Sequence, residues 1–156
     1  MTDSRVHIVV PEPHYTLFDI TRNDLPEVIV VNDALLAFQH HEIFPWHLEV
    51  DIQAEHLADK GMPTPEESQL LFEIGDKIES AIEGRNSLFL ARSTWDGLRQ
   101  LSFRVHDPEL ANDTLQSLLA DKPHTRFWEY RMHHDPEWQE AGCIFRLFPL
   151  ANGPDA

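Results

Sequence analysis

The chain has 156 residues, of which 42% are hydrophobic and 25% charged, the composition of an ordinary single folded domain. Its 27 acidic and 12 basic residues give a formal net charge of −15 at pH 7, a field that repels phosphate backbones and anionic lipid. No stretch approaches the roughly 20 apolar residues that span a bilayer, and no secretory signal precedes Pro11, so we expect a cytoplasmic protein.

The first 42 residues contain three weak strand patterns, at residues 6–10, 15–20 and 27–31. Residues 34–38 fit either a strand or a helical turn. We interpret this segment as additions to a larger sheet, because about 40 residues rarely fold alone.

The clearest strand covers residues 46–55, where apolar and polar side chains alternate. A period of two places one face on a core and the other in water. The apolar face carries Trp46, Leu48, Val50, Ile52 and Ala54, and the polar face His47, Glu49, Asp51, Gln53 and Glu55.

A helix is predicted at residues 65–83. Thr64 can cap its first turn, Pro65 suits the first helical position, and Glu67 completes a capping box. Apolar residues then recur at helical spacing until Gly84, which predicts the end of the helix.

Two strands follow at residues 87–94 and 98–106, joined by Asp96-Gly97, a favoured hairpin turn. Asp107-Pro108 then opens a second helix, at residues 108–120. A further strand is predicted at residues 125–132. After it we expect a turn that begins at Asp135, a final strand at residues 143–148 that extends a sheet edge, and a loose tail.

The order strand, helix, strand, strand, helix, strand consists of two split βαβ units and predicts a ferredoxin-like α+β sandwich. We expect an antiparallel sheet with both helices on one face and extra N-terminal strands. The prediction is one domain over residues 1–150. It consists of additions at 1–42, a core at 43–133 and a turn with a final strand at 134–149; residues 151–156 form the tail.

Three short motifs follow one another along the chain: Gly61-Met62-Pro63-Thr64 with Glu67, Asp96-Gly97-Leu98-Arg99, and Asp135-Pro136-x-Trp138 with Phe148-Pro149. In order and spacing they resemble a bacterial family known only as domain of unknown function 695. The strand Val28-Ile29-Val30-Val31-Asn32 is similar to that family's opening segment. The family is distantly similar to the regulator of ribonuclease E activity B, a ferredoxin-like protein that binds another protein. The resemblance therefore implies a fold and carries over no catalytic residue.

One set of side chains has the composition of a metal site. His47, Glu49 and Asp51 share a strand face with neighbours about 6–7 Å apart, and His106 ends a strand expected to lie beside them. The alternative is a solvated polar face on an acidic protein. We assign no catalytic residue, cofactor or dedicated metal.

Other chemistries have little support. Cys143 is the single cysteine, so the chain has neither an internal disulfide nor a cysteine zinc cage, and its apolar neighbours predict an inert thiol. No nucleophile elbow or glycine-rich phosphate loop occurs. The polar strand faces lack the aromatic side chains that stack RNA bases.

Trp95, at the tip of the predicted hairpin, either folds back on the sheet or marks a contact surface. Our leading hypothesis is a non-catalytic cytoplasmic module that binds a protein with a basic surface, without nucleic acid or membrane as partners. The alternatives are a metal-dependent hydrolase that uses the His47 set, and a structural subunit that self-associates along an exposed edge strand. The oligomeric state is left open.

Overall fold

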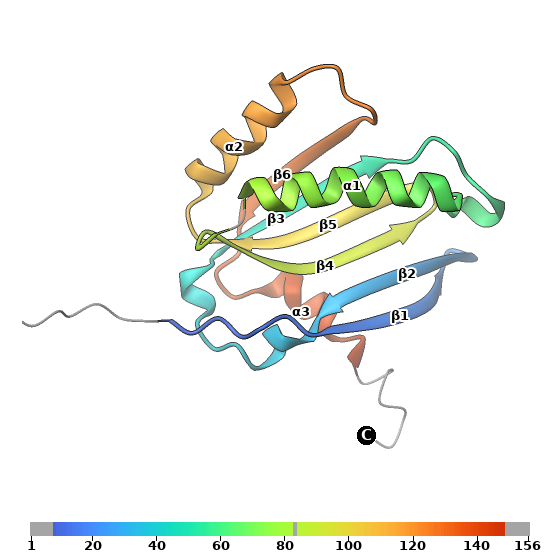
Figure 1. Cartoon of the computed structure of the whole chain (residues 1–156). Helices are drawn as coiled ribbons and strands as arrows, with labels where there is room; N and C mark the ends of the chain where they lie inside the picture. Colours follow the sequence, from blue (N-terminus) through green and yellow to red (C-terminus); the bar gives the residue numbers. More distant parts are fainter. Residues whose placement is uncertain (1–7, 83, 149–156) are drawn as a thin grey trace, which may run out of the picture.

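The computed structural model describes residues 8–82 and 84–148. These residues form an α+β fold with one six-stranded sheet and three α-helices (Figure 1). The strands are β1 Tyr15–Arg22, β2 Leu25–Asn32, β3 Trp46–Gln53, β4 Ser87–Trp95, β5 Leu98–Val105 and β6 Trp128–His134. The helices are α1 Pro65–Ile82, α2 Pro108–Ala120 and α3 Gln139–Phe145, with short 3₁₀ turns at Asp33–Ala37, His41–Ile43 and Asp59–Gly61.

The sheet has the strand order β1-β2-β4-β5-β3-β6, and every neighbouring pair is antiparallel. The predicted hairpin turn is confirmed, because Asp96 and Gly97 both have positive φ, as a tight hairpin turn requires. The β1–β2 hairpin uses the same device at Asn23 and Asp24, also at positive φ. Both hairpins therefore fix their register through the turn.

One core cluster lies between the sheet and the pair α1 and α2, which contact each other. Its buried members come from β3, α1, β5, α2 and β6: Leu48, Val50, Ile52, Leu71, Ile78, Ile82, Leu101, Phe103, Val105, Ala111, Leu115 and Trp128. Gly75 lies within this contact, where an added Cβ would come within 3.3 Å of the Leu101 side chain. The helical glycine therefore lets α1 approach the sheet closely.

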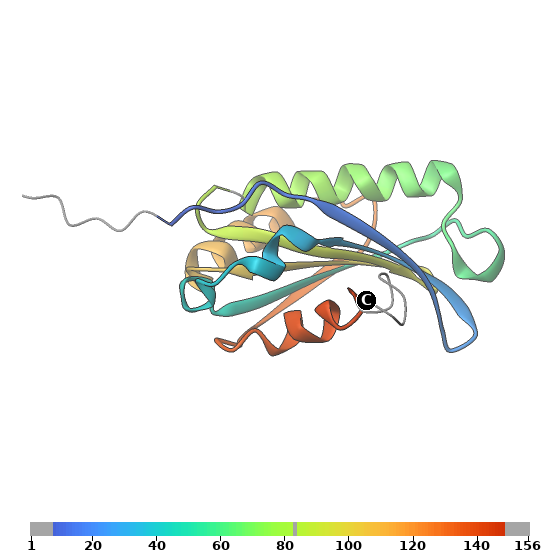
Figure 2. The ribbon, with the colours of Figure 1, turned by 90° about the horizontal axis from the view of Figure 1, so that it is seen from below.

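A second core cluster contains side chains from α3, the 3₁₀ turns and the β1–β2–β4 side of the sheet. Figure 2 shows α3 on the side of the sheet opposite α1. The buried members are Phe18, Val31, Leu35, Phe38, Phe44, Leu88, Leu90, Ala91, Trp138 and Ala141. The molecule therefore has helices on both faces of the sheet.

Several expectations for the chain ends are wrong. Residues 143–148 contain no final strand, because α3 occupies Gln139–Phe145 and the chain continues through turns. The apolar positions Ala141, Ile144 and Phe145 also fit the helical period, and the Asp135 carboxylate stabilises the helix start by accepting the Gln139 and Glu140 amides. The thiol of Cys143 is exposed, not packed. The sheet edges are β1 and β6.

At the other end of the chain, Ile8–Val10 is not a strand, and residues 6–7 and the tail at 151–156 lie outside the described residues. The open choice at residues 34–38 resolves as the 3₁₀ turn Asp33–Ala37. The predicted α+β class, the antiparallel sheet and the two extra N-terminal strands β1 and β2 are confirmed.

The start of α1 follows the capping motif only in part. The Glu67 amide donates to Thr64 Oγ1 at 3.2 Å, as predicted. The Glu67 carboxylate, however, binds Arg126 at 2.6 and 2.7 Å and accepts the Glu55 amide at 2.7 Å. Glu67 is only 2% exposed, and the Arg126 hydrogen bonds lower its pKa to about 2. This residue thus ties α1 to the loop before β6.

Glu67→Gln should lower the free energy of unfolding at neutral pH by less than the roughly 3–5 kcal/mol of an isolated buried charge, because Arg126 loses its buried partner but keeps the exposed Glu55. The folded-state pKa lies below the usual value of 4.5, so this stabilisation is complete above that pH and is lost as the pH falls towards about 2. Urea unfolding of both proteins across this range measures the difference, which should narrow in acid. The exposed neighbour Glu66→Gln is the control and should change stability little. An equal loss in both variants would contradict the prediction.

Candidate functional site

The polar face of β3 is not solvated as predicted. His47 is only 1% exposed, and Glu49 and Asp51 are partly buried. The reason is α3, which crosses this side of the sheet and brings Glu140 next to His47 and Glu49. Because residues 143–148 were predicted to form a strand, the sequence placed no helix over this face.

Glu49 and Asp51 belong to a closed network of hydrogen bonds across β3, β5 and β6. Arg131, opposite Glu49 in the β3–β6 register, donates to Glu49 and to Asp51, the latter at 2.7 Å. The Gln100 amide donates to the same two carboxylates at 3.0 and 2.9 Å. The hydrogen bond from His47, with the charge of Arg131, lowers the pKa of Glu49 against the opposing effect of burial. Both carboxylates are thus hydrogen-bonded by side chains of β5 and β6.

The structure does not assemble the predicted set His47, Glu49, Asp51 and His106. The His106 ring lies against the 41–43 turn, where Nδ1 donates to the Ile43 carbonyl at 2.6 Å. The group whose ligand atoms lie within 4.8 Å of one another is His47, Glu49 and Glu140. Sequence reasoning missed Glu140 because it lies on α3, although Asp135-Pro136 was available as a signal for a helix start.

Hydrogen bonding at His47 works against metal coordination. Arg104 Nη1 lies 3.2 Å from His47 Nδ1, and a guanidinium has only donors, so Nδ1 is an acceptor. The proton of the neutral ring is then on Nε2, which faces Glu49 Oε1 at 3.2 Å. A ligating nitrogen needs a free lone pair, and neither ring nitrogen offers one to an ion in this arrangement. The cluster has the composition of a metal site without the required histidine tautomer.

We therefore expect the purified chain to carry no stoichiometric metal at His47. Elemental analysis of the wild-type protein and of His47→Ala measures this directly. About one zinc, nickel or iron per chain, lost in His47→Ala, would contradict the prediction and support the hydrolase alternative.

The buried guanidinium of Arg104 connects the sheet to α3. Arg104 is fully buried and donates to the Asp135 carboxylate at 2.9 Å, to the Asp135 carbonyl at 2.6 Å and to the Phe44 carbonyl at 3.2 Å. Its guanidinium also lies over the Trp138 ring, 4.8 Å from the centroid. Burial lowers the pKa of Arg104, and the hydrogen bond to Asp135 opposes that shift. The positive charge of Arg104 is thus balanced by the Asp135 carboxylate and by the carbonyl groups of Asp135 and Phe44.

Asp135 serves two elements at once. Its carboxylate accepts the amides of Gln139 and Glu140 at 3.0 and 3.1 Å, which caps α3, and it also pairs with Arg104. Burial would raise the pKa of Asp135, but these two amides and Arg104 together hold it below the usual value. The Trp138 indole donates to the Phe44 carbonyl at 3.0 Å and stacks on His41. The Asp135-Pro136-x-Trp138 motif is therefore the anchor of α3.

Asp135→Ala should destabilise the protein by about 3–5 kcal/mol, because it leaves Arg104 buried without its carboxylate and also removes a helix cap. Asp107→Ala is the matched control, since the Asp107 carboxylate caps α2 by accepting the Glu109 and Leu110 amides and these hydrogen bonds are exposed to solvent. The control should cost only about 1 kcal/mol. Chemical unfolding measures both losses, and equal values would show that the Arg104 pair contributes nothing.

The Asp96-Gly97-Leu98-Arg99 motif also has a structural explanation. Arg99 is 3% exposed, donates to Thr94 Oγ1 at 2.8 Å and lies over the Phe72 ring at 4.6 Å. Its Nη1 has no hydrogen-bond partner among the described residues, and a cavity of about 10 Å³, close to the size of one water, adjoins it. Burial lowers the pKa of Arg99 to about 10. This residue fills the space between α1 and the β4–β5 hairpin.

Trp95 lies at the end of β4, where Arg22 covers one face of its ring at 3.9 Å. The indole nitrogen donates to the Arg22 carbonyl at 2.9 Å. The side chain is half-buried, so the ring folds back onto the β1–β2 hairpin. Its role as a partner contact stays a prediction.

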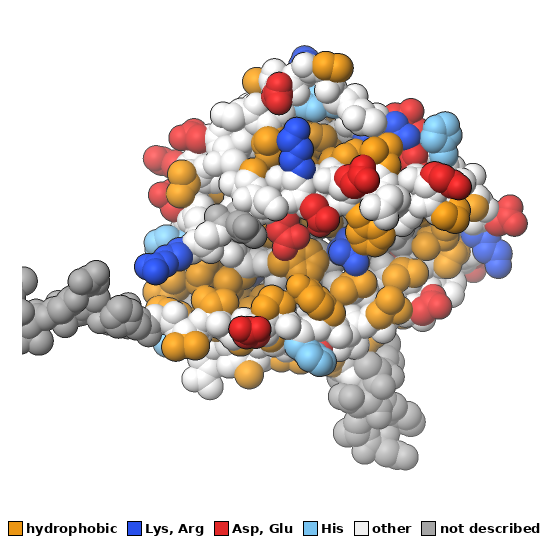
Figure 3. Space-filling model, viewed as in Figure 1, with side chains coloured by type: hydrophobic (Ala, Val, Ile, Leu, Met, Phe, Trp, Pro, Cys, Tyr) orange, Lys and Arg blue, Asp and Glu red, His pale blue; other side chains and the backbone are white. Residues whose placement is uncertain are grey.

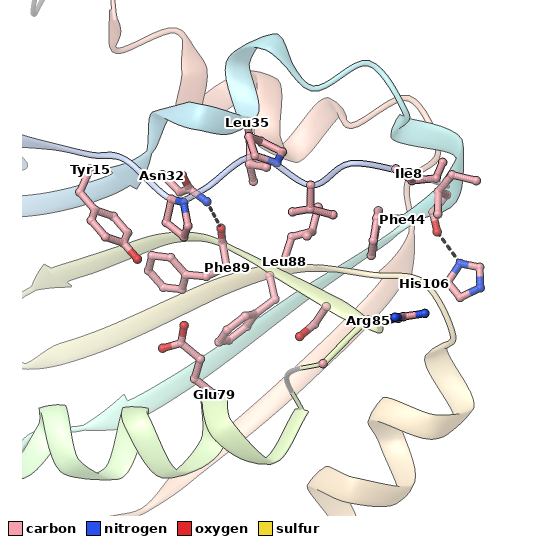
Figure 4. A pocket seen from close by; sticks show the side chains of 17 residues that line it. Ile8, Tyr15, Asn32, Leu35, Phe44, Glu79, Arg85, Leu88, Phe89 and His106 are labelled. Carbon is pink, nitrogen blue, oxygen red and sulfur yellow. Dashed lines mark hydrogen bonds between the residues drawn. The ribbon is translucent and has the colours of Figure 1, made fainter. Parts of the chain in front are cut away.

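A pocket of about 720 Å³ opens at the other end of β4, between α1, β4 and the segment before β1 (Figure 4). Its apolar lining includes Ile8, Val10, Leu35, Leu88, Phe89 and Phe103. Glu79, Arg85 and His106 supply charged or titratable groups. A volume of this size falls within the range of small-molecule sites, roughly 300–1,000 Å³.

The pocket exists because the sheet divides at this point. β2 pairs with β4 only from Ala91 to Trp95. Just beyond, between Phe89 and Ala91, β4 also shifts its register against β5. The chain that crosses the gap contains Pro11 and Pro13, which lack the amide hydrogens needed to complete the sheet. Asn32 bridges the gap instead, donating to the Phe89 carbonyl at 3.0 Å (Figure 4).

The segment before β1 is held in place over this gap. The His14 amide donates to Asn32 Oδ1 at 3.2 Å, and the Asp33 amide donates to the His14 carbonyl at 2.7 Å. The His14 ring also hydrogen-bonds Asp33 at 2.8 Å. These bonds fix one wall of the pocket.

Fold and site together define an α+β protein with a closed ion-pair network under α3 and an open apolar pocket beside β4. A family model described as "Family of unknown function (DUF695)" matches residues 15–140. The chain belongs to this family, which confirms the resemblance seen in its motifs. No curated protein and no solved structure matches the chain. Within residues 8–82 and 84–148, no helix has the length and apolar character needed to cross a membrane.

Proposed function

We propose that this protein is a non-catalytic binding module, and that its partner is a protein with a basic surface. The observation that carries the proposal is an apolar sheet face that no described helix covers. On β1, Tyr15 is 54% and Leu17 is 63% exposed. Leu17 pairs with Val30 of β2, and Val28 and Val30 belong to neither core cluster.

This face lies on the α1 side of the sheet, beyond the edge of α1. Figure 3 shows hydrophobic side chains gathered there over β4, β2 and β1. The exposed acids Asp19 on β1 and Asp76 on α1 border it. An apolar centre with a charged rim is the usual anatomy of a protein interface. With a net charge of −15, complementary basic partners would be favoured and acidic ones repelled.

The network under α3 supports a non-catalytic role. The carboxylates of Glu49 and Asp51 are engaged by Arg131 and Gln100, and the His47 ring is engaged at both nitrogens. A general base needs a proton acceptor that substrate can reach, and these side chains are committed to one another.

The finer description of the fold is part of the proposal. We infer that β3, α1, β4, β5, α2 and β6 form a ferredoxin-like unit, which the strand order β4-β5-β3-β6 and the shared core of α1 and α2 support. The distant similarity to the regulator of ribonuclease E activity B, which we expected from the sequence motifs, would agree with a role in binding another protein by fold analogy. A cytoplasmic location would suit this role.

Leu17→Ser should weaken capture of the partner, because it removes exposed apolar area from the centre of the proposed face. Leu110→Ser is the matched control, since Leu110 is 55% exposed on α2, away from this face. The immobilised wild-type and variant proteins are incubated with native lysate, and the retained proteins are identified by mass. Retention by the wild type and by Leu110→Ser should fall as salt is raised from about 0.05 to 0.5 M, because screening weakens charge attraction.

Equal retention of the partner by Leu17→Ser and by the wild type would show that the sheet face is not the docking site. Retention that does not change with salt would show that charge attraction does not contribute to binding. Light scattering tests self-association. A dimer that Leu17→Ser abolishes would replace the proposal with the structural-subunit alternative.

A further inference from the structure

The pocket beside β4 has the size and lining of a ligand site in its own right. Apolar side chains from five separate parts of the chain line its volume of about 720 Å³. Figure 4 shows Leu88 and Phe89 of β4 along its length, Leu35 and Ile8 above them, and Phe44 near the end where His106 lies. Such a lining suits the hydrocarbon part of a ligand.

Arg85 gives this pocket a positive charge at its mouth. It is the single Lys or Arg among the described lining residues, it is exposed, and no carboxylate of a described residue pairs with it. Its guanidinium offers several donors and suits a carboxylate, which it can bind through two parallel hydrogen bonds.

The other ionisable lining groups do not compete for that role. Glu79 lies towards the Tyr15 and Phe89 end of the pocket (Figure 4). Burial lowers the pKa of Arg92, and the charges of Asp76 and Glu79 oppose that shift, so Glu79 also acts on Arg92. The Nδ1 of His106 is already engaged with the Ile43 carbonyl. The pocket therefore has a carboxylate towards one end and an exposed guanidinium towards the other.

We propose that this pocket binds a single-chain anionic amphiphile, a medium-chain carboxylate whose carboxylate meets Arg85 and whose chain lies along Leu88 and Phe89. Glu79 sets the direction, because a carboxylate at the opposite end would be repelled. This site goes beyond the proposed function, because it takes a small ligand rather than the protein partner. It adjoins the proposed docking face of β1 and β2 at Tyr15, whereas Leu17, Val28 and Val30 of that face do not line it.

Three probes with the same chain and different head groups test the proposal. Isothermal titration calorimetry compares decanoate, decan-1-ol and decylammonium on the full chain. Decanoate should bind most tightly and decylammonium least. Arg85→Gln should weaken decanoate binding about tenfold, the value of a hydrogen-bonded charge, and leave decan-1-ol unchanged. Lys77→Gln is the control, because it removes one exposed positive charge from α1 outside this pocket.

A second pair of variants locates the chain. Val10 lines the pocket and is 43% exposed, whereas its neighbour Val9 is 83% exposed and does not line it. Val10→Trp should fill the pocket and weaken both decanoate and decan-1-ol, while Val9→Trp should affect neither. Circular dichroism and thermal unfolding verify that each variant is folded.

The proposal is overturned if none of the probes binds, if decan-1-ol binds as tightly as decanoate, or if decylammonium binds best. It is also overturned if Lys77→Gln weakens decanoate as much as Arg85→Gln, since the effect would then be one of net charge. The lysate experiment with Leu17→Ser and Leu110→Ser tests the protein-docking face, and the calorimetry tests the pocket. Either proposal can therefore fail while the other holds.

Discussion

The buried guanidinium of Arg104 is the constraint on which the second face of the sheet depends. A fully buried charge is tolerated only with a partner and satisfied hydrogen bonds, and Arg104 finds both in Asp135 and the Phe44 carbonyl. The same carboxylate caps α3, so helix formation and charge pairing stabilise each other. Once α3 is fixed, it covers His47 and closes the polar face of β3. A site with the composition of a metal centre thereby becomes part of the core.

At the start of β4, by contrast, a pocket stays open. There the sheet lacks a continuous neighbour, because β2 leaves it after Asn32 and the prolines of the preceding segment cannot donate to it. The result is an apolar pocket with Arg85 at its mouth. The two candidate regions thus differ for a physical reason. In the network under α3 the charged side chains pair with one another and fill the space. Beside β4 the sheet lacks a backbone partner, and a pocket stays open.

The motifs of the family are explained mainly by structure. Glu67 pairs with Arg126, Arg99 lies over Phe72, and Asp135 anchors α3. Each places a charged side chain in a buried position between two elements that are far apart in sequence. Such positions restrict the residue type strongly, because losing one partner leaves the other charge buried. Function is therefore better sought in the exposed face of β1 and in the pocket, whose residues lie largely outside these motifs.

The sequence by itself determined α1, α2, both strands of the Asp96-Gly97 hairpin and β3, because caps, turn residues and periodicity are local signals. It also determined the charge and the family. Only the tertiary structure decided that His47 is buried, that Glu140 rather than His106 approaches it, and that residues 139–145 are helical. These outcomes depend on Arg104 meeting Asp135 across 31 residues of chain, a contact that no local pattern encodes. The pocket likewise arises where the pairing of β2 with β4 stops, and register between distant strands is a property of the folded sheet.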